Sequence, residues 1–190
     1  MNFIKFLVYP WVWLLFPTAF KGKKNIPKGR VIFICNHTSN IDGILLVLST
    51  WRKQYFLAKK ELFKNRFMCG IMKFVHAIPV DRGKTDLNAI KLSMRVLNDE
   101  KVLTIFPEGT RNKTEQELSE VKAGAAMFAI KTKTPIVPVW IKKKPKVFCP
   151  NTLRFGKAFT LEEFYDQKLT AEVMEKAGQK IAEKLLENKI

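Results

Sequence analysis

The sequence predicts a single α/β domain with a mostly parallel central sheet flanked by helices. Its 190 residues fit one domain, since domains commonly run to roughly 100–200 residues. From residue 30 onward, short apolar runs alternate with segments of helical spacing. Because these runs are apolar throughout, their strands would be buried on both faces, as in a parallel sheet covered by helices.

The chain begins with an apolar segment, residues 6–20, that contains no charged side chain. As a helix it would measure about 22 Å, short of the ~30 Å hydrocarbon core of a bilayer, and Pro10 and Pro17 would interrupt it. It could be a secretory signal, a buried core element or a monotopic segment lying in the membrane interface. Its Trp and Tyr side chains and the lysines that follow favour the interface. We therefore expect residues 1–24 to anchor the chain at a membrane and residues 25–190 to form the domain.

The remaining elements are predicted in order from residue type and spacing. Runs of β-branched and aromatic residues predict strands at 30–35, 54–58, 76–80, 101–106 and 135–141, with a further edge strand at 152–159. Helical spacing predicts helices at 42–51, 61–75, 85–98 and roughly 116–131, and an amphipathic helix at 170–188.

The charge of the chain predicts polyanionic partners. The formal net charge is +17, and residues 1–160 hold 29 basic and 10 acidic side chains. Such a surface attracts nucleic acid, anionic lipid, a phosphorylated substrate or an acidic carrier protein. The three cysteines are odd in number and widely spaced, so they predict neither a disulfide framework nor a zinc site, and a reducing compartment is expected.

A polar cluster follows the first predicted strand of the domain. His37 lies five residues before Asp42, and the carboxylate can reach the imidazole if the chain turns from strand into helix between them. Asp42 would then hold the ring and leave its other nitrogen to accept a proton. The alternative is an Asp that caps a helix beside an idle histidine.

Two further clusters follow later strands, Asp-Arg-Gly at 81–83 and Pro-Glu-Gly-Thr-Arg at 107–111. The glycine of the second cluster would allow the backbone to approach a ligand, and Arg82 and Arg111 offer rigid forks to phosphate oxygens. Lys59 could add a point charge. Taken alone, each cluster could also be a turn with solvated charges.

Several chemistries find no pattern in the sequence. There is no Gly-x-Ser-x-Gly nucleophile elbow, no phosphate-binding glycine loop and no metal-ligand set, and Cys35 stands in an apolar strand as a buried, inert thiol. A general base without a protein nucleophile implies a substrate that brings its own nucleophile, such as a hydroxyl.

In this order, the clusters resemble the four motifs of the glycerophospholipid acyltransferases. NHTSNID (36–42) is similar to the first motif, Asn-His-x-x-x-x-Asp, IPVDRG (78–83) to the second and FPEGTR (106–111) to the third. TPIVPVWI, around Pro138, resembles the fourth. The chain is most similar to the bacterial-type 1-acyl-sn-glycerol-3-phosphate acyltransferases. The likeness covers roughly residues 25–160, and four motifs in register are far more specific than one.

The resemblance implies transfer of an acyl group from acyl-CoA or acyl-acyl carrier protein to the hydroxyl of lysophosphatidic acid, without an acyl-enzyme, a cofactor or a metal. It implies His37 as general base and Asp42 as its orienter. The substrate-binding residues it implies are Lys59, Arg82, Glu108, Gly109, Thr110, Arg111 and Pro138. We expect a membrane surface as partner, at the cytoplasmic face of the cell membrane, and no nucleic acid. Glycerol 3-phosphate or another lysophospholipid is the alternative acceptor, and a basic nucleic-acid or lipid-binding module is the non-enzymatic alternative.

Overall fold

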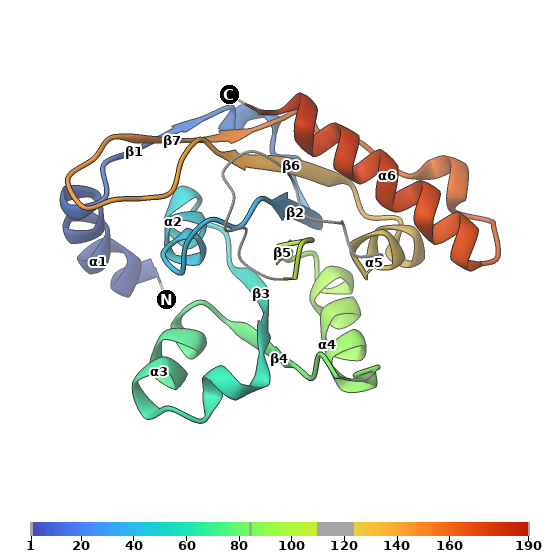
Figure 1. Cartoon of the computed structure of the whole chain (residues 1–190), viewed down its shortest axis with the longest axis horizontal. Coiled ribbons are helices and arrows are strands. Elements are labelled where there is room, and N and C mark those ends of the chain that lie inside the picture. Colours follow the sequence, from blue (N-terminus) through green and yellow to red (C-terminus); the bar gives the residue numbers. More distant parts are fainter. Residues whose placement is uncertain (1, 84, 110–123, 190) are drawn as a thin grey trace.

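One mixed sheet runs through the part of the chain that the computed structural model describes, which is residues 2–83, 85–109 and 124–189. Its strands are β1 (Thr18–Lys21), β2 (Val31–Cys35), β3 (Gln54–Lys59), β4 (Ala77–Val80), β5 (Val102–Ile105), β6 (Ile136–Ile141) and β7 (Asn151–Phe155). Their spatial order is β1-β7-β6-β2-β5-β3-β4 (Figure 1). The strands from β6 to β4 in this order are parallel, β7 is antiparallel to β6, and β1 is parallel to β7. The predicted mostly parallel sheet is confirmed.

Helices cover both faces of the sheet. They are α1 (Asn2–Leu15), α2 (Asp42–Ser49), α3 (Arg66–Phe74), α4 (Leu87–Asn98), α5 (Gly124–Thr132) and α6 (Ala171–Glu187), with short 3₁₀ turns η1 (Lys23–Asn25), η2 (Lys60–Phe63) and η3 (Glu162–Phe164). One apolar core joins the sheet to α4, α5 and α6, and the other joins it to α1, α2 and α3. Figure 1 shows these two groups on opposite sides of the sheet.

Strand β2 explains why the predicted strands are apolar without alternation. Ile32 and Ile34 pack into the core under α4, α5 and α6, whereas Val31, Phe33 and Cys35 pack into the core under α2. All five side chains are fully buried. A strand covered on both faces needs apolar residues at every position, as the sequence pattern indicated.

The parallel pairing brings the ends of several strands to one edge of the sheet. Ile34 of β2 lies opposite Ile105 of β5 and Pro138 of β6. The residues that follow β2, β5 and β6 therefore emerge side by side, which is where ligands bind in open α/β sheets.

The N-terminal segment differs from the prediction in its local structure. Pro10 lies inside α1 rather than interrupting it, and the chain leaves the helix only before Pro17. Residues 18–21 then form β1, which the sequence analysis missed because it treated 6–20 as one apolar segment. The loss of one helical hydrogen bond at Pro10 is offset by the packing of α1 on the domain.

A buried lysine holds α1 against the end of α2. The Lys5 ammonium donates hydrogen bonds to the carbonyl oxygens of Thr50, at 3.1 Å, and Arg52, at 3.2 Å. Its side chain is only 2% exposed, and burial lowers its pKa to about 8. Val12 of α1 and Phe16, directly after the helix, also pack against the α2 core.

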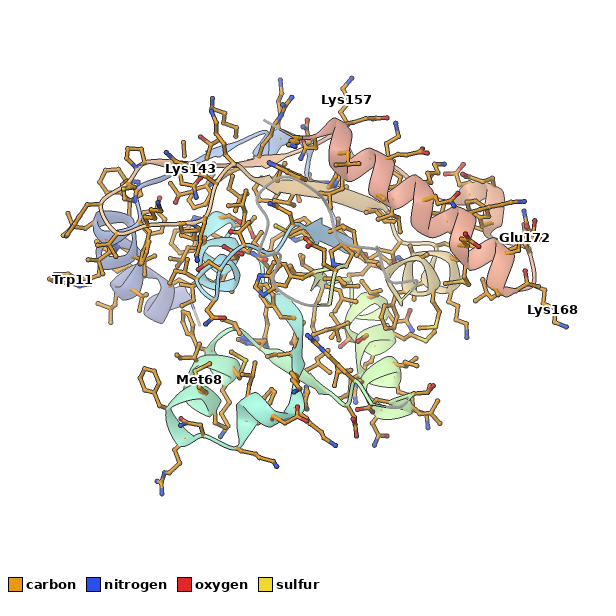
Figure 2. All side chains as sticks on the ribbon, in the orientation of Figure 1. Trp11, Met68, Lys143, Lys157, Lys168 and Glu172 are labelled. Atoms are coloured by element: carbon orange, nitrogen blue, oxygen red, sulfur yellow. The ribbon has the colours of Figure 1, made fainter. Side chains whose placement is uncertain are left out.

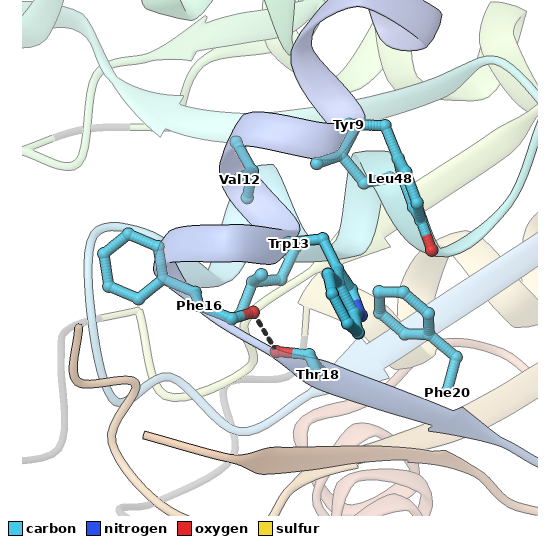
Figure 3. A pocket seen from close by; sticks show the side chains of 8 residues that line it. Tyr9, Val12, Trp13, Phe16, Thr18, Phe20 and Leu48 are labelled. Carbon is cyan, nitrogen blue, oxygen red and sulfur yellow. Dashed lines mark hydrogen bonds between the residues drawn. The ribbon is translucent and has the colours of Figure 1, made fainter. Parts of the chain in front are cut away.

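An apolar hollow lies where α1, α2 and β1 meet (Figure 3). Its lining is mainly aromatic and aliphatic, and the Thr18 hydroxyl donates to the Phe16 carbonyl at 2.9 Å. No helix in the described part of the chain combines the length and hydropathy needed to cross a bilayer. Membrane association of residues 1–24 stays a prediction.

Two other elements correct the sequence analysis. The single helix expected over 61–75 is divided into η2 and α3, because Asn65 caps α3 by accepting a hydrogen bond from the Met68 N–H. Strand β7 corresponds to the edge strand expected at 152–159. It is not at the edge of the sheet, because β1 pairs with its outer side. Of the helix expected over 116–131, the described part is α5, and residues 116–123 lie outside the described chain.

Gly22 links β1 to η1 with a left-handed backbone, at φ 73°, and a Cβ there would collide with the Phe155 carbonyl. Gly22→Ala is expected to lower the free energy of unfolding by about 1–2 kcal/mol or more, because an L-residue is strained in this region even without a clash. Urea unfolding followed by circular dichroism measures the change. Gly70→Ala in α3 is the matched control, since its Cβ meets nothing within 4 Å and should stabilise the helix by about 0.5–1 kcal/mol. Equal stability of the two variants would contradict the expectation.

Candidate active site

The site begins with the Asn36 side chain, which adds one pair of hydrogen bonds at the end of the sheet. Asn36 follows β2, and its amide accepts a hydrogen bond from the Ile141 N–H at 2.8 Å and donates one to the Ile141 carbonyl at 3.0 Å. The side chain is buried. It takes the place of a backbone partner at the end of β6 and fixes the direction in which the chain leaves β2 toward His37.

The predicted His-Asp pair is present. Nδ1 of His37 lies 3.1 Å from Oδ2 of Asp42. The His37 side chain is 20% exposed and that of Asp42 is fully buried. With Nδ1–H donating to the carboxylate, Nε2 is the ring nitrogen left to accept a proton.

Asp42 also organises the loop between β2 and α2. Its Oδ2 accepts hydrogen bonds from the backbone N–H groups of Thr38, at 2.6 Å, and Ser39, at 2.7 Å. The Thr38 hydroxyl donates to Oδ1 at 3.2 Å. Because Asp42 is the first residue of α2, these donors and the helix N-terminus all favour a negative charge there. The loop therefore directs the Asp42 carboxyl group at the imidazole.

The turn after β5 packs against the ring and the backbone of His37. The ring of Phe106 stacks on that of His37, with centroids 4.1 Å apart and an interplanar angle of 23°. Glu108 Oε1 accepts a hydrogen bond from the His37 backbone N–H at 3.1 Å. Glu108 is only 3% exposed, and its Oε2 has no hydrogen-bond partner among the described residues. Glu108, predicted as a substrate-pocket residue, thus contacts the backbone of the histidine itself.

Arg82 connects the second cluster to the third. Its guanidinium donates a hydrogen bond to the carbonyl of Gly109, whose φ of 66° turns the chain back. The side chain of Arg82 is exposed, and its guanidinium carries further N–H donors beside the one that binds Gly109.

Two lysines stand at the end of β3, which pairs with the strand that precedes Arg82. Lys59 is opposite Val80 in the sheet, two residues before Arg82, and its ammonium is 3.9 Å from Glu61. Lys60 donates to Asp81 at 2.5 Å, and that bond raises its pKa. Lys60 is thus paired with a carboxylate of the second cluster, and Lys59 lies in the neighbouring strand.

One predicted residue, Pro138, stands apart from this group, and two others are outside the described residues. Pro138 is buried within β6, opposite Ile34, and its carbonyl accepts hydrogen bonds from Gly156 N–H and the Asn188 side chain. It is a sheet residue rather than one at the carboxyl edge. Thr110 and Arg111 lie outside the described residues.

Cys35 fits its predicted inert role. It is fully buried, and burial together with the charges of Asp42 and Glu108 raises the pKa of its thiol well above the usual value. A thiol of this kind is a poor nucleophile. In the described parts of the chain, no group of three or more His, Cys, Asp or Glu side chains is arranged to hold a metal ion.

Sequence reasoning missed the part played by Asn36 and Phe106. Asn36 stands directly after the strand predicted at 30–35, and Phe106 is the last residue of the strand predicted at 101–106 and the first after β5. That position was the available signal. Their partners are far along the chain, Asn36 being 105 residues from Ile141. Spacing alone could not identify such pairs.

Comparison with known proteins gives a consistent result. The Acyltransferase family model matches residues 18–142. The chain is 35% identical over 119 residues to the 1-acyl-sn-glycerol-3-phosphate acyltransferase of Bacillus subtilis, covering 62% of this chain and 58% of that protein. It is 36% identical over 110 residues to the protein of that name from Streptococcus pneumoniae, covering 57% and 40%. The alignments thus span about half the length of these relatives.

The fold also has a solved counterpart. The crystal structure of the 1-acyl-sn-glycerophosphate (LPA) acyltransferase PlsC from Thermotoga maritima superposes with a TM-score of 0.68. The match covers 98% of this chain and 76% of that one, at 24% sequence identity. At this identity, the likeness establishes the fold alone.

Asn36→Ala is expected to lower the free energy of unfolding by about 2–4 kcal/mol, because it leaves the buried N–H and carbonyl of Ile141 without partners, at about 1–3 kcal/mol each. Chemical denaturation measures the loss. Asn88→Ala, at an exposed position of α4, is the matched control and should change stability by less than about 0.5 kcal/mol. A loss at Asn36 no larger than that at Asn88 would contradict the bracing role.

Proposed function

The chain belongs to the Acyltransferase family, and from this premise we propose that it acylates the free hydroxyl of 1-acyl-sn-glycerol 3-phosphate to give phosphatidic acid in phospholipid biosynthesis. The donor would be acyl-CoA or acyl-acyl carrier protein. Relatives named for this activity, in Bacillus subtilis and Streptococcus pneumoniae, support the acceptor. The observation that carries the proposal is the 3.1 Å contact between His37 and Asp42 beside Arg82 and its loop.

The histidine would act as the general base. Nε2 of His37 takes the proton of the acceptor hydroxyl as its oxygen attacks the thioester carbonyl carbon. The imidazolium that forms is stabilised by the Asp42 carboxylate, which already receives the Nδ1–H. Since Asp42 is fully buried, its interaction with the charged ring is weakly screened by water.

Collapse of the tetrahedral intermediate completes the transfer. The carbon–sulfur bond breaks, the ester carbonyl forms again, and the imidazolium returns its proton to the departing thiolate. The atoms balance without an acyl-enzyme, which agrees with the buried, protonated Cys35 as the cysteine nearest to the site in sequence. The stack of Phe106 on His37 holds the ring plane through both proton transfers.

Arg82 and Lys59 would bind the phosphate of the acceptor. Arg82 is tied to Gly109 by one of its donors and keeps the others for phosphate oxygens. Gly109 belongs to the same turn that carries Phe106 and Glu108, both in contact with His37. The position of the phosphate would therefore be set relative to the base by a few short contacts.

We further propose that the chain works at the cytoplasmic face of the cell membrane. The acceptor and product are amphiphiles held in the bilayer, and α1 presents exposed aromatic side chains, with Trp11 at 69% and Trp13 at 52% exposure. Tryptophan is favoured at the headgroup level.

The test is an assay of the purified protein with lysophosphatidic acid, glycerol 3-phosphate and lysophosphatidylcholine, each with acyl-CoA and with acyl-acyl carrier protein. Lysophosphatidic acid should be the preferred acceptor. His37→Ala should lower its acylation at least ~100-fold, since general base catalysis contributes typically 10²–10⁴-fold. His76→Asn is the matched control, because His76 has a left-handed φ of 52° that Asn tolerates, and it should keep near-normal activity. Equal activity of the two variants, both folded by circular dichroism, would exclude His37 as the base.

Arg82→Ala is expected to raise the KM for lysophosphatidic acid about 10–100-fold, because a charge-assisted hydrogen bond contributes about 1.5–3 kcal/mol. The KM for the thioester donor should change little. Steady-state kinetics with each substrate varied in turn separate the two effects. Arg95→Ala, on the exposed face of α4, serves as control. An unchanged acceptor KM in Arg82→Ala would reject the phosphate role.

A further inference from the structure

The loop between β6 and β7 is basic and exposes large apolar side chains. Residues 142–150 read KKKPKVFCP and contain four lysines and no acid. All four lysines are exposed, Val147 is 50% exposed and Phe148 is 68% exposed. The nearest acidic residues along the chain are outside 135–160. The loop thus combines exposed apolar side chains with lysines and contains no acidic residue. Such a combination indicates a surface that contacts a partner rather than water alone.

Backbone hydrogen bonds fix this loop to the end of α1. Phe148 N–H donates to the Leu15 carbonyl at 2.7 Å, and Asn151 N–H donates to the Pro17 carbonyl at 2.9 Å. Leu14 and Leu15 are themselves 55% and 40% exposed. The apolar tip of the loop is therefore continuous with the exposed apolar end of α1.

The other end of the loop starts at the active site. Lys142 directly follows Ile141, whose backbone is paired with the Asn36 side chain, and Asn36 precedes His37. Residues 142–148, seven in all, thus lead from Ile141, the partner of Asn36, to Leu15 of α1. The loop therefore connects the neighbour of His37 to the apolar end of α1.

The charge distribution of the molecule agrees with a basic, aromatic surface at the end that carries this loop and α1. In Figure 2, Lys143 and Trp11 lie toward the same end of the molecule, whereas Glu172 on α6 lies at the opposite end. Residues 1–41 contain no acidic side chain, while residues 161–190 hold seven acids and five basic residues. One end is basic and aromatic and the other is slightly acidic, which gives the molecule a preferred face toward an anionic surface.

We propose that residues 142–150 form a bilayer-docking loop, in which Val147 and Phe148 enter the interface and the four lysines bind anionic lipid headgroups. Residues 1–24 are expected to contact the lipid, and the loop at 142–150 adds a second lipid contact. It also turns the carboxyl edge of the sheet, with His37, toward the headgroups. The orientation matters only if the chain has the proposed function. The lipid contact itself does not depend on that function.

A bilayer fits the loop better than a nucleic acid does. Duplex binding would use the lysines alone and leave Val147 and Phe148 in water. Lipid binding uses both kinds of side chain, since lysines near an anionic leaflet and apolar side chains in the interface each add affinity.

The experiment measures partition of the full chain onto vesicles of phosphatidylcholine with about 30–40% phosphatidylglycerol, without any thioester donor. Phe148→Asn should lower the partition coefficient about ten-fold. Its fold should be kept, because Phe148 has a left-handed φ of 59° that Asn tolerates better than Phe. Leu92→Gln, which removes a 46% exposed apolar side chain from α4, is the matched control and should have no effect.

The charge is tested separately. Lys143→Gln with Lys144→Gln should lower partition onto these vesicles about 30-fold, since each lysine at an anionic surface contributes about a factor of five. Partition onto pure phosphatidylcholine should not change. Lys91→Gln with Lys168→Gln removes the same charge from exposed positions elsewhere and should have a much smaller effect.

A second readout does not depend on loss of binding. Cys149 is exposed, next to Phe148, and Cys35 is buried. A polarity-sensitive fluorophore on Cys149, in a Cys69→Ser chain, should shift to the blue on anionic vesicles. The same fluorophore on Leu92→Cys, with Cys69 and Cys149 both changed to Ser, should not shift.

Three outcomes would overturn the proposal. They are unchanged partition of both loop variants, no blue shift at Cys149, or loss of duplex DNA binding in the lysine variant while vesicle partition stays the same. Because no acyl transfer is measured, failure here leaves the proposed enzyme untouched, and an inactive enzyme leaves the loop result valid.

Discussion

The buried carboxylate of Asp42 is the group on which the rest of the site depends. A fully buried negative charge is stable only when donors surround it, and here they are two backbone N–H groups, one hydroxyl and the imidazole of His37. The loop from β2 to α2 must take one shape to supply them. That shape directs the histidine, so the same interactions that stabilise the buried carboxylate also position the imidazole of His37.

Much of this could be predicted from the sequence. The apolar strands, the order of elements and the presence of polar clusters after β2, β4 and β5 follow from local composition. The spacing of His37 and Asp42 was also sufficient, because a strand followed by a helix leaves few ways to arrange five residues. Local patterns predict local geometry, and both partners of this pair are local.

What could not be predicted depends on partners distant in the sequence. Helix α1 continues through Pro10 and is held by the contact of Lys5 with Thr50 and Arg52, which no N-terminal pattern specifies. Strand β1 forms because β7 offers an unpaired edge 130 residues later. The contact of Glu108 with the backbone of His37 likewise crosses 71 residues. Residue propensities determine which helices and strands form, whereas the packing of the sheet determines which loops come into contact.

The loops at the carboxyl edge are joined to one another across the sheet. Asn36 binds the end of β6, His37 binds Glu108 after β5, Arg82 binds Gly109, and Lys60 binds Asp81. Each contact joins two segments at this edge of the sheet, so His37 and Arg82 belong to one connected set. A change in one member would therefore be felt by its neighbours. Substitutions within the set should therefore combine non-additively, and the ordered appearance of the clusters in the sequence reflects a single assembled edge rather than independent motifs.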